Sequence, residues 1–116
     1  MAYFDISVAA APADQKDAYI AFAKKVGQIF KEAGALSVID TWGDDIPEGK
    51  VTDFRRAVAL KDGETVAVGW ITWPDKATRD QAWEKLMGPD SPMNGMDMPF
   101  DGKRMIFGAF DGISEI

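Results

Sequence analysis

The feature that most constrains the fold is a change in hydrophobic periodicity that occurs twice along the chain. Residues 3–9 alternate between apolar and polar side chains, which is typical of a β-strand with one apolar face. From Asp14 the apolar residues recur at steps of three and four as far as Gly34, which predicts a helix of about five turns. A β-rich run over 65–73 and a second helical pattern from Asp75 repeat the order of strand and helix.

Three further β-rich runs complete the order of elements. The segments 36–42, 54–60 and 103–110 are predicted to be strands, and an Asp-Gly pair after the second run is a strong hairpin signal. The first two runs are either separate strands or one long strand bent at the acidic loop between them. The order β-α-β-(β)-β-α-β is the split βαβ plan, so we expect an α+β, ferredoxin-like fold with an antiparallel sheet, in a single domain over residues 1–116.

Two of the expected strands are apolar on both faces. The runs 65–73 and 103–110 carry large apolar side chains at successive positions rather than at alternate ones. Two helices cover only one face of a ferredoxin-like sheet, and a second face in contact with water should carry polar side chains. We therefore expect an obligate homodimer whose sheets pack face to face.

The composition excludes several classes of function. The 116 residues include no His and no Cys, which excludes disulfides, thiol nucleophiles, His-based triads, haem ligated by His or Cys, and the usual zinc sites. We expect no cofactor and no metal. The 13 basic and 19 acidic residues give a net charge of −6, which disfavours nucleic acid and anionic membranes as partners. No export signal or membrane-spanning apolar segment is present, so we expect a cytoplasmic protein.

Acidic and aromatic residues near the end of the second expected strand form the first candidate site. Asp40, Trp42 and Asp44 lie close together in the chain. A tryptophan beside carboxylates suits one wall of a pocket that holds a general base. The alternative is a solvated acidic turn with no chemical role.

Four further residues could bind or activate a substrate. Arg55 could anchor a carboxylate or phosphate through its planar fork, and Trp70 could form an aromatic wall. Tyr3 could donate its hydroxyl, and Lys103 could contribute a positive charge. The alternatives are an ion pair for Arg55, core or interface packing for the tryptophans, and a purely structural turn over 98–105.

Three sequence motifs resemble a known bacterial family. The segments 42–45 (Trp-Gly-Asp-Asp), 47–52 (Pro-x-Gly-Lys-Val-Thr) and 98–105 (Met-Pro-Phe-Asp-Gly-Lys-Arg-Met) look like the YbaA-like family, domain of unknown function 1428, and the resemblance runs end to end. Relatives often carry a Cys where this chain has Thr41, so a thiol role would not transfer. The resemblance implies a dimeric α+β barrel, in which two ferredoxin-like protomers join through their sheets.

The wider superfamily includes cofactor-free monooxygenases, haem-degrading enzymes and isomerases, but a shared fold does not fix a function. Two hypotheses therefore stay open. One is a small-molecule-binding dimer or cofactor-independent enzyme acting on a small aromatic or enolisable acid, with catalytic Asp40, Asp44 and Tyr3 and substrate-binding Trp42, Arg55, Trp70 and Lys103. The other is a non-catalytic dimeric binding or interaction module that uses the acidic loop and the methionine-rich loop 88–102 as contact surfaces.

Overall fold

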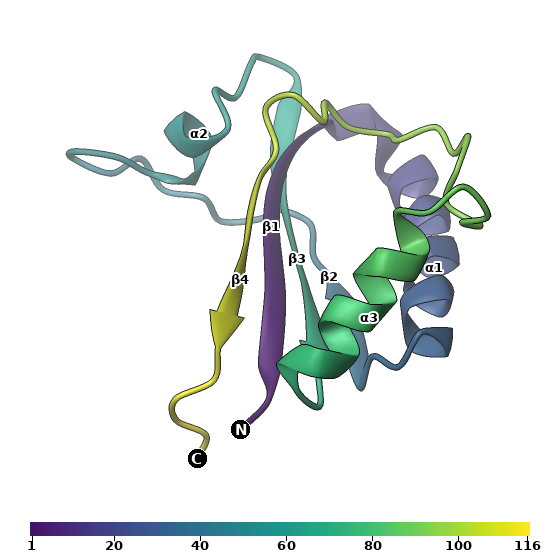
Figure 1. Ribbon diagram of the computed structural model, residues 1–116. Helices are drawn as coiled ribbons and strands as arrows, with labels where there is room; N and C mark the ends of the chain where they lie inside the picture. The colour runs from purple at the N-terminus through teal and green to yellow at the C-terminus, as the bar shows by residue number, and fades with distance from the viewer.

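Two helices lie against one face of a four-stranded antiparallel sheet in the computed structural model, which describes residues 1–116 (Figure 1). The elements in chain order are β1 (Tyr3–Pro12), a 3₁₀ turn (Ala13–Gln15), α1 (Lys16–Glu32), β2 (Ser37–Asp40), α2 (Phe54–Ala57), β3 (Glu64–Trp73), α3 (Lys76–Leu86) and β4 (Ile106–Asp111). The strands lie in the order β2-β3-β1-β4. This arrangement confirms the predicted α+β, ferredoxin-like fold.

The central strands β1 and β3 decide which residues face which layer. They pair over their whole length, from Tyr3 opposite Trp73 to Pro12 opposite Glu64. Side chains alternate between the two faces of a sheet, and Tyr3, Ile71 and Trp73 pack in the core beneath the helices. The odd-numbered residues of β1 and β3 therefore face the helices, and the even-numbered ones face the other side.

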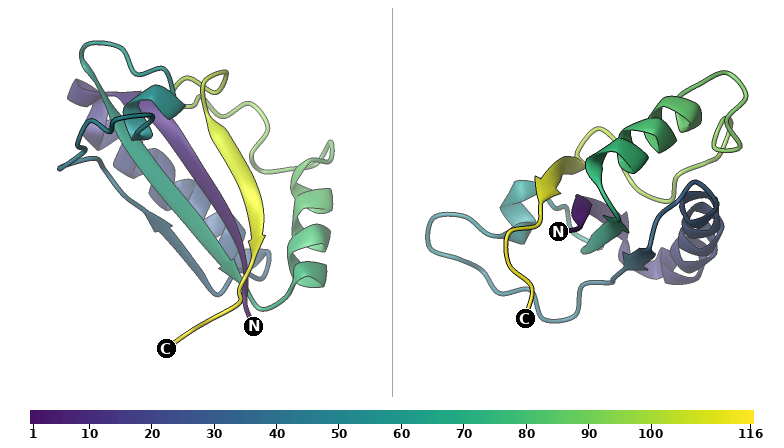
Figure 2. Two further views of the ribbon diagram at one scale, coloured as in Figure 1. Left: turned by 90° about the vertical axis from the view of Figure 1, so that its left-hand side faces the viewer. Right: turned by 60° about the horizontal axis from the view of Figure 1, so that its bottom comes forward.

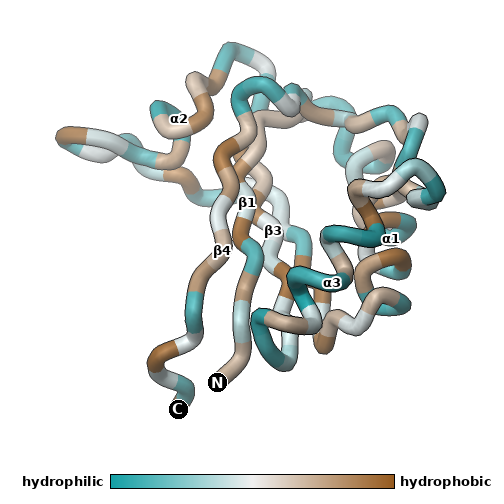
Figure 3. Tube along the Cα trace, in the orientation of Figure 1, coloured by the Kyte–Doolittle hydropathy of each residue, from teal (hydrophilic) through white to brown (hydrophobic).

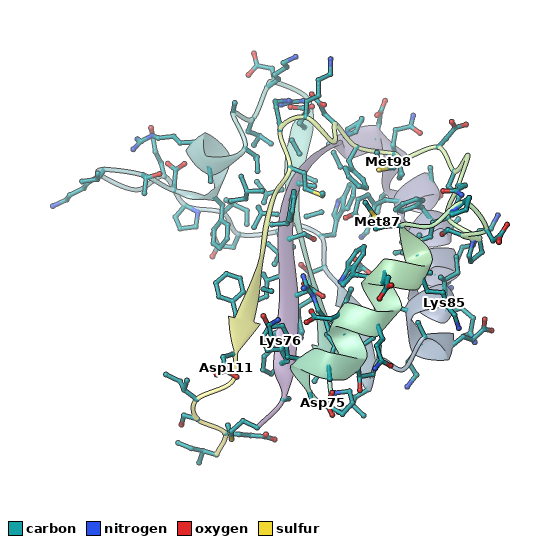
Figure 4. The ribbon with its side chains drawn as sticks, in the orientation of Figure 1. Asp75, Lys76, Lys85, Met87, Met98 and Asp111 are labelled. Carbon is teal, nitrogen blue, oxygen red and sulfur yellow. The ribbon has the colours of Figure 1, made fainter.

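The helices α1 and α3 begin and end close to the predicted positions. The Asp75 carboxylate accepts a hydrogen bond from the backbone N–H of Thr78 (2.7 Å) and caps the start of α3. Figure 4 shows Asp75 at this end of α3 and Met87 at the other. Phe30 from α1 and Leu86 from α3 meet Trp73 in the core, so both helices are held by large apolar side chains.

The opposite face of the sheet is covered over only half its length. Residues 43–60, which we call the arm, fold back over one end of this face and bury Val58 against Val8, Ala10 and Val66. In Figures 1 and 2 the arm, the sheet and the helices form successive layers, with the arm near the end of the sheet where β3 begins.

The rest of that face carries apolar side chains that no element of the chain covers. We call it the open patch, and it consists of Phe4, Ile6, Ile39, Trp70, Ile106 and Phe110. The hydropathy colouring shows apolar segments along this side of the sheet and at the tip of the arm (Figure 3).

In the whole chain no helix is both long and apolar enough to cross a bilayer.

Three predicted strand assignments need correction. The segment 54–60 is not a strand, because Asp53 caps a short helix by accepting from the Arg56 N–H (2.7 Å) and Ala59 turns the chain with a positive φ of 48°. The run 36–42 forms a strand only over Ser37–Asp40, so neither of the two alternatives considered for these runs is correct.

The last strand begins three residues later than predicted, at Ile106 rather than at 103. The Asp101 carboxylate accepts from the backbone N–H of Lys103 (3.0 Å), and the Asp101 carbonyl accepts from that of Arg104 (3.2 Å). These bonds hold residues 101–104 in a turn. The N–H groups of Lys103 and Arg104 are used within this turn, so neither residue joins the ladder of β4.

Candidate functional site

An open groove of about 700 Å³ lies between α1 and β2. One wall is a single face of α1, and the other is β2 with the residues that follow it. The two walls come close together at Gly27 of α1, where a Cβ atom would be in van der Waals contact with Val38 of β2 at 3.7 Å. A groove of this size can hold a small organic molecule.

Aromatic residues form the end of the groove next to the start of α1. Tyr19 is buried, and its ring lies edge-on to Trp42 with 5.2 Å between ring centroids. The ring of Phe100 also packs against Tyr19, with 6.0 Å between ring centroids. Burial, and then the charge of Asp40, raise the pKa of Tyr19 to about 12, so its hydroxyl keeps its proton at neutral pH.

Asp40 places a carboxylate in the groove beside these rings. Asp40 pairs with Gly69 of β3. A Cβ atom at position 69 would lie only 2.7 Å from the Asp40 carboxylate, so the Asp40 side chain occupies space that is free because residue 69 is glycine. Although Asp40 is exposed on its outer side, burial by the surrounding protein raises its pKa above the ordinary value of aspartate. A carboxylate whose pKa is raised in this way is better suited to proton transfer near neutrality.

Three lysines make this groove positive in a chain of net charge −6. Lys16, Lys24 and Lys31 lie along the same face of α1 and all line the groove. Lys31 donates to the Leu36 carbonyl (2.9 Å), while Lys16 and Lys24 have no ion-pair partner. The free charges of Lys16 and Lys24 suit an anionic ligand.

The predicted site residues fall into separate places. Asp40 and Trp42 share the groove, whereas Asp44 and Arg55 line a second recess of about 150 Å³ at the base of the arm. Arg55 lies on α2 rather than on a strand, and its Nε donates to the Ile46 carbonyl (3.0 Å). The guanidinium therefore helps to hold the arm together.

The other three predicted site residues lie outside both recesses. Tyr3 faces the helices, on the side of β1 opposite Phe4 and Ile6, with the Arg79 guanidinium 5.9 Å from its ring centre. Trp70 faces the opposite side of the sheet and belongs to the open patch, so it does not share a pocket with Trp42. Lys103 is exposed in the turn before β4. Their roles stay predictions.

Residues of the 98–105 motif build this turn and attach it to β3. Arg104 donates to both carboxylate oxygens of Glu64 (2.8 and 2.6 Å) and to the Asp101 carboxylate (2.8 Å). Phe100 fills the space beside Tyr19 and Phe22. These contacts favour the structural interpretation of the motif over a ligand-binding one.

One polar cluster under the helices escaped the sequence analysis. The Asp5 carboxylate accepts from the indole N–H groups of Trp73 (2.9 Å) and Trp83 (2.8 Å) and from the guanidinium of Arg79 (2.9 Å). The sequence signal for this cluster was a single one, a carboxylate in the middle of a strand. The partners of Asp5 could not be found from the sequence pattern because they lie about 70 residues further along the chain. No group of three or more carboxylates in the chain is arranged to hold a metal ion.

The fold and the groove define a ferredoxin-like α+β protein with a lysine-lined recess at one edge of its sheet. The sequence matches the family described as "Protein of unknown function (DUF1428)" over residues 2–102. It is 50% identical over 114 residues to the "Uncharacterized protein YbaA" of Escherichia coli strain K12 and to that of Shigella flexneri, covering 97% of this chain and 97% of each relative. The chain belongs to the DUF1428 family, which confirms the resemblance of its motifs.

Proposed function

We propose that this protein binds a small organic acid in the groove between α1 and β2. The observation that carries the proposal is the combination of Asp40, Trp42 and the unpaired Lys24 in one recess. Each contributes a different interaction: the ammonium attracts a carboxylate, the indole contacts a planar or apolar body, and the carboxyl group exchanges a proton.

The same arrangement supports acid–base chemistry without a cofactor. Asp40 would take a proton from a carbon next to a carbonyl group of the ligand and return it to another position. The positive charges of Lys16 and Lys24 would stabilise the enolate that forms between these two steps. An enolisable or aromatic acid is therefore the substrate class we favour.

Binding without turnover is the second candidate function. The groove is open along the sheet edge, so bulk water is not excluded from it, whereas enzymes that form reactive enolates usually close their sites. A non-catalytic module would bind the same class of ligand but leave it unchanged.

Native mass spectrometry of the protein purified gently from its own host would test binding first. We expect a reproducible extra mass that identifies a small acid. That acid would then be titrated by tryptophan fluorescence, where Lys24→Gln should weaken binding by about tenfold because one charge-assisted contact is lost. Lys85→Gln, which removes the same charge from α3, is the matched control and should bind normally (Figure 4). Equal binding by both variants would disprove the site.

Turnover is tested with the same ligand in D₂O. Exchange of a carbon-bound proton that is abolished by Asp40→Asn would establish an enzyme. Tight binding with no exchange and no product would establish the binding module.

We also propose that the chain forms a homodimer through the face of the sheet opposite the helices. In β1 the helices cover the side that carries Asp5 and Ser7, while the more apolar side with Phe4 and Ile6 is left open. The sheet therefore buries its more polar face under the helices and exposes its more apolar face. An exposed apolar face of this kind favours association with a partner that covers it. A second copy of this chain is the partner we favour, because it is present wherever the chain is made and most soluble oligomers are homo-oligomers.

Sedimentation velocity at micromolar concentration should give the mass of a dimer. Phe110→Asp should shift it to a monomer, because a charge would be placed in the interface. Phe110 is 52% exposed in the protomer, so this change should leave the fold intact. Met98→Asp, at a 55% exposed residue on the side of the helices, is the control and should stay dimeric (Figure 4). A monomeric wild type would overturn the proposal.

A further inference from the structure

The arm is a rigid structure that leaves its own apolar tip exposed. Asp53 accepts from the Gly49 N–H (3.1 Å) as well as from the Arg56 N–H (2.7 Å), and the Arg56 guanidinium donates back to the Gly49 carbonyl (3.0 Å). The turn is tight enough that a side chain at 49 would collide with the Thr52 carbonyl oxygen. These bonds hold the loop over 49–56 in one shape by contacts within the arm.

This fixed loop presents two apolar side chains to solvent. Val51 is 91% exposed and Phe54 is 50% exposed, although the base of the arm buries Val58 completely. Figure 1 shows the tip extending away from the sheet on the side opposite the helices, and Figure 3 shows an apolar segment at its end, flanked by more polar ones. Ordered backbone that holds apolar side chains in water is typical of a surface that contacts a partner.

The position of the arm restricts how two sheets can meet face to face. It protrudes from the half of the face that lies next to the start of β3, and the open patch occupies the other half. A two-fold axis parallel to the strands would bring one arm against the other. An axis across the strands brings each arm against the open patch of the partner and fills both halves.

We propose that the arm of each protomer docks on the open patch of a second copy of this chain, with Val51 and Phe54 packed near Phe110 and Trp70 of that copy. The proposal rests on the homodimer described above and adds its symmetry and its principal contact. The dimer axis then runs across the strands, and each arm is sandwiched between the sheet of its own protomer and that of its partner.

Charge supports the same docking. Lys50 at the tip has no ion-pair partner, because the nearby Glu48 is paired with Arg56 (3.5 Å). The tail 112–116, which follows β4 at the end of the open patch, contains Glu115 and no basic residue. A lysine brought beside this acidic segment gains attraction that it lacks within its own protomer.

The first test is the dimer dissociation constant of Val51→Asp, measured by sedimentation. We expect an increase of at least tenfold over the wild type, because a charge would enter an apolar contact. The nearly complete exposure of Val51 means that the protomer itself should fold normally. Met87→Asp, at a 78% exposed residue on the side of the helices, is the matched control and should dimerise like the wild type.

The outcomes separate this inference from the homodimer itself. A Val51→Asp protein that dimerises as tightly as the wild type, while Phe110→Asp does not, would overturn docking of the arm and leave the face-to-face dimer standing. An equal loss in the Met87→Asp control would also overturn it. A monomeric wild type would overturn both.

A second test reads the symmetry directly, since the natural chain has no cysteine. A mixture of Val51→Cys and Phe110→Cys protomers should give covalent mixed dimers with a short bis-maleimide. Val51→Cys alone should remain uncrosslinked, because an axis across the strands keeps the two arm tips apart. Crosslinking of Val51→Cys to itself, or no crosslinking in the mixture, would contradict the proposed axis.

Discussion

At the scale of single residues, Asp5 shows how one carboxylate can organise the space between a sheet and two helices. Its side chain is only 13% exposed and accepts from two indoles and one guanidinium. The two tryptophans come from the end of β3 and from α3, so the carboxylate ties these segments to β1. A buried charge is tolerated here because all its neighbours are donors.

Asp5→Asn should lower the free energy of unfolding by about 2 kcal/mol, because Arg79 loses its counter-ion. Both indoles donate to one Asp5 oxygen and Arg79 Nη2 donates to the other, so the amide NH₂ must face either the indoles or the guanidinium. Urea denaturation would measure the loss. Asp80→Asn is the control: Asp80 also pairs with Arg79 (3.1 Å) but is exposed, so the change should stay within about 0.5 kcal/mol. Equal effects of the two substitutions would mean that the Asp5 cluster is not a special source of stability.

Asp40 should have the opposite effect on stability. Burial raises its pKa, so at neutral pH the folded protein carries a carboxylate that would be better solvated in the unfolded chain. We therefore expect Asp40→Asn to melt at a higher temperature than the wild type at pH 7. The difference should close as the pH falls through the raised pKa of Asp40, and vanish below about 3.9, the ordinary value. Thermal melts between pH 3 and 7 would show it, and a difference that is constant with pH would contradict it.

At the scale of elements, the turn over 101–104 is attached to the start of β3 by Arg104 and Glu64. The guanidinium of Arg104 lowers the pKa of Glu64 to about 2 and also lowers the pKa of Asp101. The pair therefore stabilises the fold above the ordinary pKa of Glu64, and this contribution disappears as the pH falls from about 4.5 to about 2.

Arg104→Gln should remove this pH-dependent contribution. The variant should melt below the wild type at pH 7, and the gap between the two melting temperatures should narrow as the pH falls from about 4.5 to about 2, because Glu64 of the wild type then takes up its proton and loses its pairing with Arg104. Lys103→Gln is a suitable control, since Lys103 is exposed and forms no ion pair. A gap that does not narrow over this pH range would show that Arg104 acts through packing rather than through charge.

At the scale of the whole molecule, the two faces of the sheet are used differently. The helices pack on one face and bury its core, whereas the other face is half covered by the arm and half exposed. Folding and association should therefore be coupled, and the melting temperature should rise with protein concentration. Calorimetry over a hundredfold range of concentration would measure this rise. A melting temperature independent of concentration would contradict a dimer that dissociates on unfolding.

The helices and the central strands could be predicted because their signals are local. The stripe of α1, the cap of α3 at Asp75 and the apolar runs of β1 and β3 each depend on neighbouring residues in the chain. The segment 54–60 was wrongly predicted to be a strand because its composition is β-rich. The signal for a helix was weaker, since the Asp53 cap starts a helix of only four residues. Of the candidate site, the sequence analysis found Asp40 and Trp42 together, since they are close in the chain.

By itself, the sequence determined the order of the four strands and the two long helices, the family, and the absence of His and Cys chemistry, because these follow from local pattern and composition. Only the tertiary structure decided which candidates share a recess. Asp40 and Lys24 line the same groove from an edge strand and a helix, while Trp70 lies on the other side of the same sheet. The reason is that strand alternation divides neighbours between two faces, and only packing determines what each face meets.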